Sequence, residues 1–255
     1  MVPLIQFIIP SYNDIRILET IRSIKAFDDI NCTGVIVIDG GSDSDTIKSI
    51  TQALDQRDIL VSEKDKGIFD ALNKGLRISS SKIISWIGSD DQITPFIKAS
   101  YVKQQLADSD ILLFDTELIN DENRVVRRTP SYPSKFRFLR SFINVPHFSS
   151  FGKRCVFIKE EFDLNLRGAD IKYFYDILTI HKPKIKTSSK VGTYQKLGGF
   201  SNSSIIGMLK TYTELISFFR ERTNLISAYF YIFLKVSFKI ANVIFYYIFR
   251  KKVSI

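Results

Sequence analysis

The chain has 255 residues, of which 45% are hydrophobic and 25% are charged. These are ordinary globular values, so they exclude a disordered or fibrous protein and allow a sizeable core. The net charge is +9, and residues 209–255 contribute most of it, with eight basic and two acidic side chains. A nearly neutral body with a basic tail favours contact with an acidic membrane surface and argues against a nucleic-acid-binding protein.

The first hundred residues alternate between apolar runs and helical patterns. Runs typical of buried strands occupy residues 4–9, 35–38, 59–61 and 83–87. Apolar side chains recur at helical spacing in residues 17–24, 44–54 and 68–78. Strands that alternate with helices indicate βαβ units, so we expect an α/β fold with a mostly parallel central sheet flanked by helices.

Short polar clusters follow each of the expected strands. They lie at residues 11–13, 39–41, 65–67 and 90–91. In an open parallel sheet, ligands bind beyond the carboxyl ends of the strands, and these clusters fall at those ends. Any one of them alone is typical of a turn, but their coincidence predicts one shared site.

The second half of the chain has a less regular pattern. We expect a strand at residues 111–114, with a hairpin partner at 125–126, and an amphipathic helix at 169–180. The two cysteines, Cys32 and Cys155, lack metal-ligand spacing, and we expect them to be buried thiols in a reducing compartment. Two histidines leave little room for a histidine-built metal site.

The adjacent carboxylates of Asp90 and Asp91 are the first candidates for chemistry. Two neighbouring carboxylates repel each other, and a divalent cation that also binds a polyphosphate relieves this repulsion. Hard Mg²⁺ or Mn²⁺ prefers carboxylate oxygen. The alternative is a solvated turn. Since the chain has no glycine-rich phosphate loop, Lys66 and Lys74 are candidates for phosphate contacts, although lone lysines are more often only solvated.

Residues 62–75, with the sequence SEKDKGIFDALNKG, resemble the signature of glycosyltransferase family 2, which has the GT-A fold. The segments IPSYN (9–13), VIDGGS (37–42) and GSDD (88–91) are similar to further motifs of this family. The resemblance is continuous over roughly residues 4–95 and is limited to isolated anchors from 100 to 205. It implies a nucleotide-sugar-binding half at 1–100 and an acceptor-binding and catalytic half at 101–208. The basic and mostly apolar composition of residues 209–255 sets them apart as a tail.

The resemblance also implies roles for residues at the strand ends. The donor, by default a UDP-sugar, would be bound by Pro10, Ser11, Tyr12, Asp39, Asp65, Lys74 and Asp90. Within this set, Asp39 would accept a hydrogen bond from the base, and Asp90 would contact ribose or sugar. Asp91 would coordinate the Mg²⁺ or Mn²⁺ that bridges the diphosphate. For Asn73, a place facing the donor and a structural role are both open.

The general base would come from the second half. The family pattern of an F-D pair followed by an A-D-Y-D segment is matched by residues 162–163 and 169–172, which makes Asp170 the base and Asp176 the alternative. An inverting transfer needs such a carboxylate to take the proton of the acceptor hydroxyl. Residues 146–150 resemble a P-H-Q segment, so His147 would help to form the acceptor site; otherwise it is a turn histidine. Residues 198–201 resemble a loop that closes over the donor.

Residues 225–249 are mostly apolar but are interrupted by Lys235 and Lys239. A membrane-spanning helix has about 20 apolar residues without central charges, so a span is disfavoured. The polar residues share one side of a helix, which predicts an amphipathic helical tail, or two helices in sequence, lying on the membrane surface. The alternative is packing against the catalytic domain or against a second copy of the chain.

We therefore expect a cytoplasmic glycosyltransferase, peripheral on the inner face of the cell membrane and similar to bacterial enzymes of surface-polysaccharide or lipopolysaccharide synthesis. Its acceptor would be a glycan or a lipid-linked saccharide. One alternative is a non-catalytic sugar-nucleotide-binding or scaffold protein. Another is a sugar-nucleotide pyrophosphorylase, which would be expected to carry a glycine-rich basic loop where this chain has residues 10–13.

Overall fold

The computed structural model describes residues 2–131, 145, 147–196, 211, 213–214 and 218. The chain divides into two compact units, one of Met1–Asn165 with Ala169–Gly199, and one of Leu166–Gly168 with Phe200–Ile255. All helices and strands named below belong to the first unit. The closing loop expected at residues 198–201 and the helical tail expected at 225–249 lie outside the described residues. The domain boundaries expected from the sequence stay a prediction.

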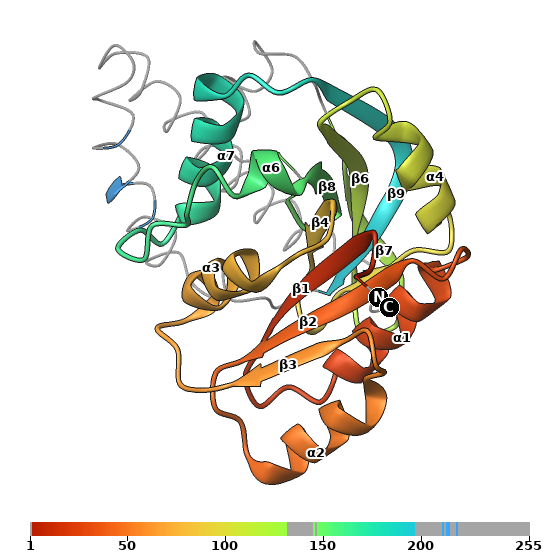
Figure 1. Cartoon of the computed structure of the whole chain (residues 1–255), viewed down its shortest axis with the longest axis vertical. Coiled ribbons are helices and arrows are strands. Elements are labelled where there is room, and N and C mark those ends of the chain that lie inside the picture. The colour runs from red at the N-terminus through yellow and green to blue at the C-terminus, as the bar shows by residue number, and fades with distance from the viewer. Residues whose placement is uncertain are drawn as a thin grey trace, which may run out of the picture. The chain divides into compact units, whose positions relative to one another are not determined.

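Parallel strands form the first half of the sheet. They are β1 (Ile5–Ser11), β2 (Thr33–Asp39), β3 (Ile59–Ser62) and β4 (Ile83–Trp86), in the spatial order β3-β2-β1-β4 (Figure 1). The connections contain α1 (Ile17–Phe27), α2 (Ser44–Ala53) and α3 (Ile68–Ile78). The predicted α/β fold with βαβ units is thereby confirmed.

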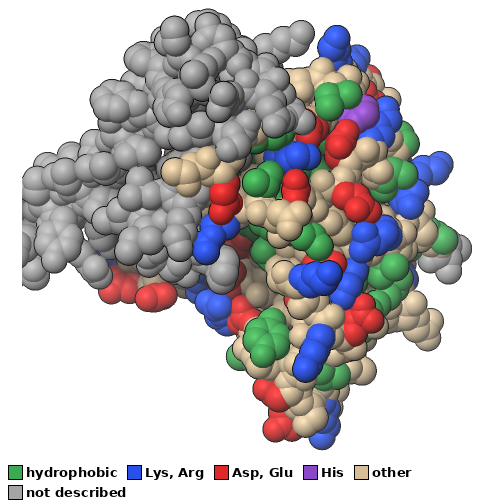
Figure 2. Space-filling model, turned by 90° about the vertical axis from the view of Figure 1, so that its left-hand side faces the viewer, with side chains coloured by type: hydrophobic (Ala, Val, Ile, Leu, Met, Phe, Trp, Pro, Cys, Tyr) green, Lys and Arg blue, Asp and Glu red, His purple; other side chains and the backbone are tan. Residues whose placement is uncertain are grey.

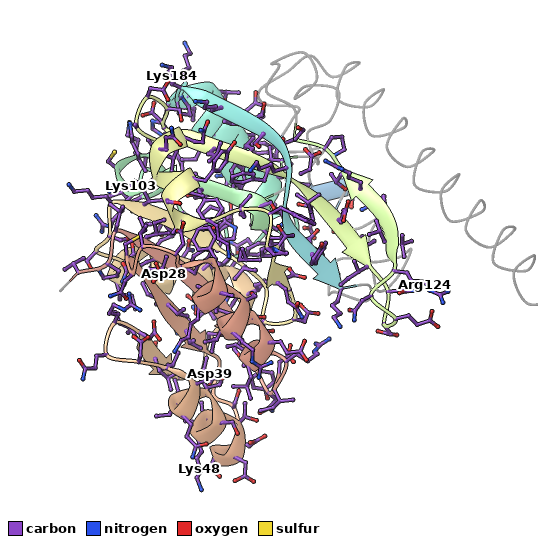
Figure 3. The ribbon with its side chains drawn as sticks, turned by 90° about the vertical axis from the view of Figure 1, so that its right-hand side faces the viewer. Asp28, Asp39, Lys48, Lys103, Arg124 and Lys184 are labelled. Atoms are coloured by element: carbon purple, nitrogen blue, oxygen red, sulfur yellow. The ribbon has the colours of Figure 1, made fainter. Side chains whose placement is uncertain are left out.

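Beyond β4 the sheet is mixed. It continues through β8 (Ser150–Lys153), β6 (Ile111–Ile119), β9 (Ile185–Lys196) and β5 (Gln92–Ile93), while β7 (Val125–Thr129) pairs with β6. Strand β8 is antiparallel to both β4 and β6, whereas β9 is parallel to β6. The hairpin expected across residues 120–123 is confirmed by the antiparallel pairing of β6 and β7, and Arg124 lies at its tip (Figure 3).

The remaining helices are α4 (Ala99–Gln105), the 3₁₀ turn η1 (His147–Ser149), α6 (Arg154–Phe157) and α7 (Ala169–Ile180). Figure 1 shows α1, α2 and α4 on one side of the sheet and α3, α6 and α7 on the other. Among these helices, the sequence pattern predicts α7 with its observed bounds, but it does not predict α4, η1 or α6.

Aromatic side chains fill the space on both faces of the sheet. On the side of α1, the ring of Phe7 contacts those of Phe27 and Phe151, with centroids 5.4 and 5.5 Å apart. On the side of α7, Trp86 of β4 is surrounded by rings of Phe157, Phe162, Tyr173 and Phe174. Burial of this much aromatic surface on both faces fixes the sheet and its helices as one core.

The described surface carries both signs of charge. Figure 2 shows basic and acidic side chains intermingled on the described part of one face.

Cys155 is exposed and Cys32 is partly buried, so the expectation that both thiols are buried is wrong for Cys155. Within the described parts of the chain, no helix combines the length and hydrophobicity needed to cross a bilayer.

Candidate active site

The polar strand ends predicted from the sequence do meet at one edge of the sheet. Ser11, the last residue of β1, is in register with Asp39, the last residue of β2. Asp39 is in register with Ser62, the last residue of β3. Backbone pairing therefore places these three side chains in a row at the carboxyl ends of the strands, where open α/β sheets bind ligands.

Asp39 is fully buried and strongly hydrogen-bonded within this row. Its carboxylate accepts from the N–H groups of Gly41 and Ser42 at 3.0 and 2.8 Å. It also accepts from the hydroxyls of Ser42 and Ser62. Oδ2 receives three of these four hydrogen bonds and Oδ1 receives one, so the remaining acceptor position for a nucleotide base is on Oδ1. The expected contact between Asp39 and the base stays a prediction.

The loop after β1 presents a stacking surface beside this row. Pro10 and Ser11 are buried, and the Ser11 hydroxyl has no hydrogen-bond partner among the residues that the structure describes. Tyr12 is 65% exposed, so its ring is free to stack on a planar group. Asn13 holds the loop in place, because its N–H donates to Ser42 Oγ at 2.7 Å and its Oδ1 accepts from the Asp43 N–H at 2.9 Å.

Asp65 and Lys74 lie in the segment between β3 and the end of α3. The carboxylate of Asp65 sits against Gly40, where an added Cβ would lie 3.0 Å from Oδ2, so a larger residue at position 40 would push on this carboxylate. The Lys74 ammonium pairs with Glu63 at 2.8 Å, and this hydrogen bond raises the pKa of the lysine. A phosphate contact by Lys74 would therefore replace an existing ion pair. Asn73, by contrast, is buried and bonds to the backbone of Phe162, which supports the structural alternative.

The acidic loop after β4 is tied to the loop after β1. Ser89 Oγ donates to Asp14 at 2.7 Å, and Arg16 donates three hydrogen bonds to the same carboxylate, two from its guanidinium and one from its backbone N–H. Burial acts to raise the pKa of Asp14, but the hydrogen bonds from Arg16 and Ser89 lower it. The Arg16 guanidinium also lies 3.3 Å from Asp90. The sequence does not single out Arg16, because nothing in its local pattern reveals a partner so far along the chain.

Asp91 is 5% exposed and lies beside Asp90 at this edge. Burial, and to a lesser degree the charge of Asp90, raises the pKa of Asp91 from 3.8 to about 7. Its Oδ1 accepts from the Lys196 N–H at 3.2 Å, and its backbone carbonyl accepts from the Thr20 hydroxyl at 2.6 Å. A carboxylate so buried beside another carboxylate favours a nearby cation.

The residues present fit a divalent cation whose coordination is completed by phosphate oxygens of a bound substrate. In the described parts of the chain, no three His, Cys, Asp or Glu side chains are grouped as metal ligands. Mg²⁺ in nucleotide sites is held by one or two carboxylates together with substrate phosphates and water. Asp90 and Asp91 therefore match a site that a bound diphosphate would complete, not a site made by protein alone.

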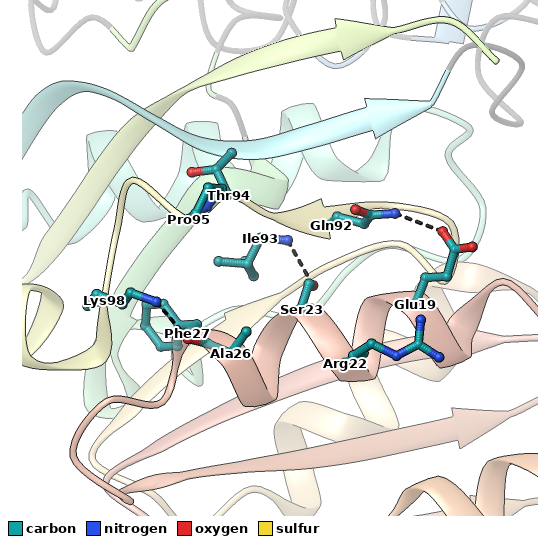
Figure 4. A pocket seen from close by; sticks show the side chains of 10 residues that line it. All are labelled: Glu19, Arg22, Ser23, Ala26, Phe27, Gln92, Ile93, Thr94, Pro95 and Lys98. Atoms are coloured by element: carbon teal, nitrogen blue, oxygen red, sulfur yellow. Dashed lines mark hydrogen bonds between the residues drawn. The ribbon is translucent and has the colours of Figure 1, made fainter. Parts of the chain in front are cut away.

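A groove of about 390 Å³ lies behind the acidic loop, between α1 and the segment that follows Asp91 (Figure 4). Hydrogen bonds cross it from Gln92 to Glu19 (2.8 Å), from Ile93 to Ser23 (3.0 Å) and from Lys98 to Ala26 (2.8 Å). These hydrogen bonds join the segment that follows the acidic loop to α1, and the polar groups involved are therefore already paired with one another.

Asp170 and Asp176, the two candidate bases, differ sharply in environment. Asp170 is in the first turn of α7 with its side chain 25% exposed, and its Oδ2 lies 3.4 Å from Nε2 of His147. Asp176 is buried and pairs with Lys172 at 3.0 Å, one turn away on the same helix. Asp170 is thus the more exposed of the two carboxylates, and its assignment as the base stays a prediction.

Strand β4 connects the acidic loop with the helix of the candidate base. Its last residue, Trp86, precedes the loop by a few positions, and its ring lies 5.7 Å from those of Tyr173 and Phe174 on α7. Because Trp86 is fully buried, the packing of α7 and the start of the acidic loop are fixed by the same side chain.

Comparison with solved structures shows that the fold is shared with glycosyltransferases. S. aureus TarS 1-349 in complex with UDP-GlcNAc is 18% identical with a TM-score of 0.62, covering 85% of this chain and 65% of that one. A second structure of S. aureus TarS is 17% identical with a TM-score of 0.59, covering 85% and 40%. Mannosyltransferase PcManGT from Pyrobaculum calidifontis, in complex with GDP-Man and Mn²⁺, is 16% identical with a TM-score of 0.62, covering 91% and 70%.

The chain therefore spans less than two thirds of the length of these TarS structures. Comparison with curated protein sequences gives no significant match. The sequence profile described as Glycosyl transferase family 2 matches residues 6–161, which include the strand ends and the acidic loop. Since this match covers more than half of the chain, the protein belongs to glycosyl transferase family 2.

Proposed function

We propose that the protein transfers a sugar from a nucleotide-diphospho-sugar to a hydroxyl of a glycan or lipid-linked saccharide, with inversion at C1. The observation that carries this proposal is the placement of Asp90 and Asp91 at the same sheet edge as the ends of β1, β2 and β3. Family membership supports the activity, and the relatives named above are described with UDP-GlcNAc and with GDP-Man and Mn²⁺.

The donor would lie across the strand ends, with its base near Tyr12 and Asp39 and its diphosphate near Asp91. Mg²⁺ or Mn²⁺ bound there would neutralise charge on the leaving diphosphate. The acceptor oxygen would attack C1 as the bond from C1 to the phosphate oxygen breaks, and the hydroxyl proton would pass to Asp170. The remaining contribution of the site is to hold donor and acceptor in line.

A donor panel tests this proposal directly. Thermal unfolding of the full chain is followed with UDP-, dTDP- and GDP-sugars, each with and without Mn²⁺. A ligand that binds only the folded protein raises its stability, by about 2.7 kcal/mol at a hundred times its Kd. We expect stabilisation by one nucleotide class, and only with the metal. A chain that responds to none of these donors would contradict the proposal.

Two further measurements separate the alternatives. A catalyst releases the nucleoside diphosphate from its donor in the presence of Mn²⁺, through transfer or slow hydrolysis, whereas a binding or scaffold protein is stabilised but releases nothing. A pyrophosphorylase instead forms pyrophosphate from a nucleoside triphosphate and a sugar phosphate. Assays of these two products therefore distinguish the three functions.

We further propose that residues 209–255 hold the protein on the inner face of the cell membrane. The support is the sequence pattern of a basic, mostly apolar tail. Flotation of the full chain with anionic and neutral vesicles tests this, with deletion of residues 225–255 as the comparison. We expect binding to anionic vesicles that the deletion abolishes while donor binding persists. Dimer loss on deletion without any vesicle binding would favour packing between copies of the chain.

A further inference from the structure

His147 and Asp170 come from different elements of the first unit and meet at short range. Nε2 of His147, in η1, lies 3.4 Å from Oδ2 of Asp170, in the first turn of α7. Their side chains are 26% and 25% exposed. A histidine that faces the carboxylate expected to accept a proton raises the question of what its ring does for that carboxylate.

The backbone around His147 is held firmly. The Ser150 hydroxyl donates to the His147 carbonyl at 2.6 Å, and the imidazole packs on the ring of Phe148 with centroids 4.0 Å apart. Ser149, at the end of η1, is buried and its hydroxyl lies 2.8 Å from that of Thr193 in β9. The 3₁₀ turn that carries the imidazole is therefore hydrogen-bonded to the sheet.

The surroundings of the ring define which nitrogen carries the proton. Nδ1 is buried and has no hydrogen-bond partner in the described structure. If Nδ1 carried the proton, a donor would be left unpaired in the interior, and the Nε2 lone pair would face carboxylate oxygen. Both are unfavourable, the first by about 1–3 kcal/mol. With the proton on Nε2, the N–H is on the ring atom that lies 3.4 Å from Asp170 Oδ2, and only a bare lone pair is buried.

A neutral ring is favoured by the same surroundings. Burial lowers the pKa of His147, while the charge of Asp170 acts in the opposite direction. A neutral imidazole with its proton on Nε2 can donate one hydrogen bond to a carboxylate. The same nitrogen has no lone pair, so it cannot accept the proton of the acceptor hydroxyl.

We propose that His147 is a positioning residue for Asp170: its Nε2–H holds Oδ2 of the carboxylate, so that Oδ1 is presented to the acceptor hydroxyl. This inference rests on the proposed function, in which Asp170 accepts the hydroxyl proton. It differs from the expectation that His147 contacts the acceptor itself, which stays a prediction. Orientation of the base matters because a displacement of about 1 Å in a reacting group lowers rates about 10²-fold.

The chain contains its own matched control. Its second histidine, His181, follows α7 and also faces a carboxylate, with Nε2 2.7 Å from Oε1 of Glu160. The side chains of this pair are 22% and 23% exposed, close to the values for His147 and Asp170. Removal of His181 thus reproduces the loss of a partly buried histidine–carboxylate pair without touching the candidate base.

A double-mutant cycle in the full chain tests the proposal. We expect His147→Leu to lower kcat by about 10- to 100-fold with little change in the KM of donor or acceptor. His147→Gln, whose amide N–H can reach a similar position, should recover part of that loss, and His181→Leu should leave kcat unchanged. In the Asp170→Asn background, His147→Leu should have no further effect, because a residue that acts through Asp170 has nothing left to position.

The opposite pattern overturns the proposal. If His147 binds the acceptor, His147→Leu raises the acceptor KM, and its effect multiplies with that of Asp170→Asn. Thermal unfolding of every variant checks that the folded state is retained, and His147→Gln keeps the comparison open if His147→Leu does not fold.

Nitrogen-15 NMR of the two histidine rings provides a readout that needs no activity, with His181→Leu used for assignment. Asp170→Asn should shift the ring signals of His147 and leave those of His181 unchanged; unshifted His147 signals would overturn the pairing. Absence of donor binding and transfer in the unmodified chain would instead overturn the proposed function, whatever the NMR result.

Discussion

The side-chain amide of Asn73 and the backbone of Phe162 form a two-way hydrogen-bonded pair. Nδ2 donates to the Phe162 carbonyl at 2.8 Å, and Oδ1 accepts from the Phe162 N–H at 2.8 Å. The stacked rings of Phe69 and Phe162 close over the same junction. Through this pair, α3 is tied to the segment that leads into α7, so a residue of the family signature joins the donor half of the fold to the half that carries the candidate base.

Asn73→Ala should destabilise the protein without a specific effect on the donor. The substitution leaves a buried carbonyl and a buried N–H of Phe162 unpaired, at about 1–3 kcal/mol each. We expect the free energy of unfolding, measured in urea, to fall by about 2–6 kcal/mol. Asn73→Asp should be no better, because a carboxylate would face the Phe162 carbonyl. Unchanged stability with lost donor affinity would instead place Asn73 in the donor site.

Gly75→Ala should also destabilise the protein, although alanine favours a helix. Helix propensity alone would add about 1 kcal/mol. An added Cβ at position 75, however, would lie 2.3 Å from Cγ2 of Ile8 in β1, and overpacking of a core costs about 1–3 kcal/mol. Ile8→Ala removes the clashing group, so the double variant should be less destabilised than the sum of the single changes. Strict additivity in urea unfolding would show that α3 and β1 do not meet here.

Two helices, α3 of the first half and α7 of the second, follow from local patterns in the sequence. The helical spacing of residues 68–78 predicts α3 with its observed bounds, and residues 169–180 do the same for α7. Helix α3 has a periodic apolar face that must be buried, and this face determines both the type of element and its place on the sheet. Helix α7 is instead buried on most of its sides.

The second half depends on contacts that are distant in sequence. Strand β9, Ile185–Lys196, contains mostly polar residues, and its strand conformation comes from pairing with β6 along its whole length. Strand β8 has only four residues between two neighbours. The site shows the same division. Asp90 and Asp91 are identifiable by residue type and by their place after a strand, and Asp170 by the family resemblance. The contact of Arg16 with Asp90, in contrast, requires the fold itself.

Asp91→Asn should abolish metal-dependent donor binding. The amide keeps the size of the side chain and can still accept from the Lys196 N–H, but it has no negative charge for a cation. Calorimetric titration of the donor should show the added affinity with Mn²⁺ in the unmodified chain and none in the variant. Asp121→Asn, at an exposed position in the β6–β7 loop, is the control. An unchanged Mn²⁺ effect in Asp91→Asn would remove Asp91 from the metal site.

His147 should make the protein less stable at mildly acid pH. Burial lowers its pKa from the ordinary value of 6.5. Below pH 6.5, therefore, His147 is protonated in the unfolded chain while it is still neutral in the folded protein. The free energy of unfolding therefore falls as the pH drops from about 7.5 to 5. His147→Gln removes this contribution, so its urea stability should decline less over the same range. Other titrating groups are shared by both proteins and cancel in the comparison. Parallel curves would contradict a neutral, partly buried His147.

Asp170→Asn and Asp176→Asn should damage the protein in different ways. Asp170 is partly exposed beside His147, and its amide analogue keeps the shape but cannot accept a proton. Transfer should fall by about 10² to 10⁴-fold while donor binding survives. Asp176 is buried and paired with Lys172 at 3.0 Å, so its replacement should lower the free energy of unfolding by about 1–3 kcal/mol and leave kcat of the folded protein near its original value. Rapid-quench assays of transfer and urea unfolding of both variants measure these effects side by side. If Asp176→Asn is inactive and Asp170→Asn is active, Asp176 is the general base and Asp170 is not.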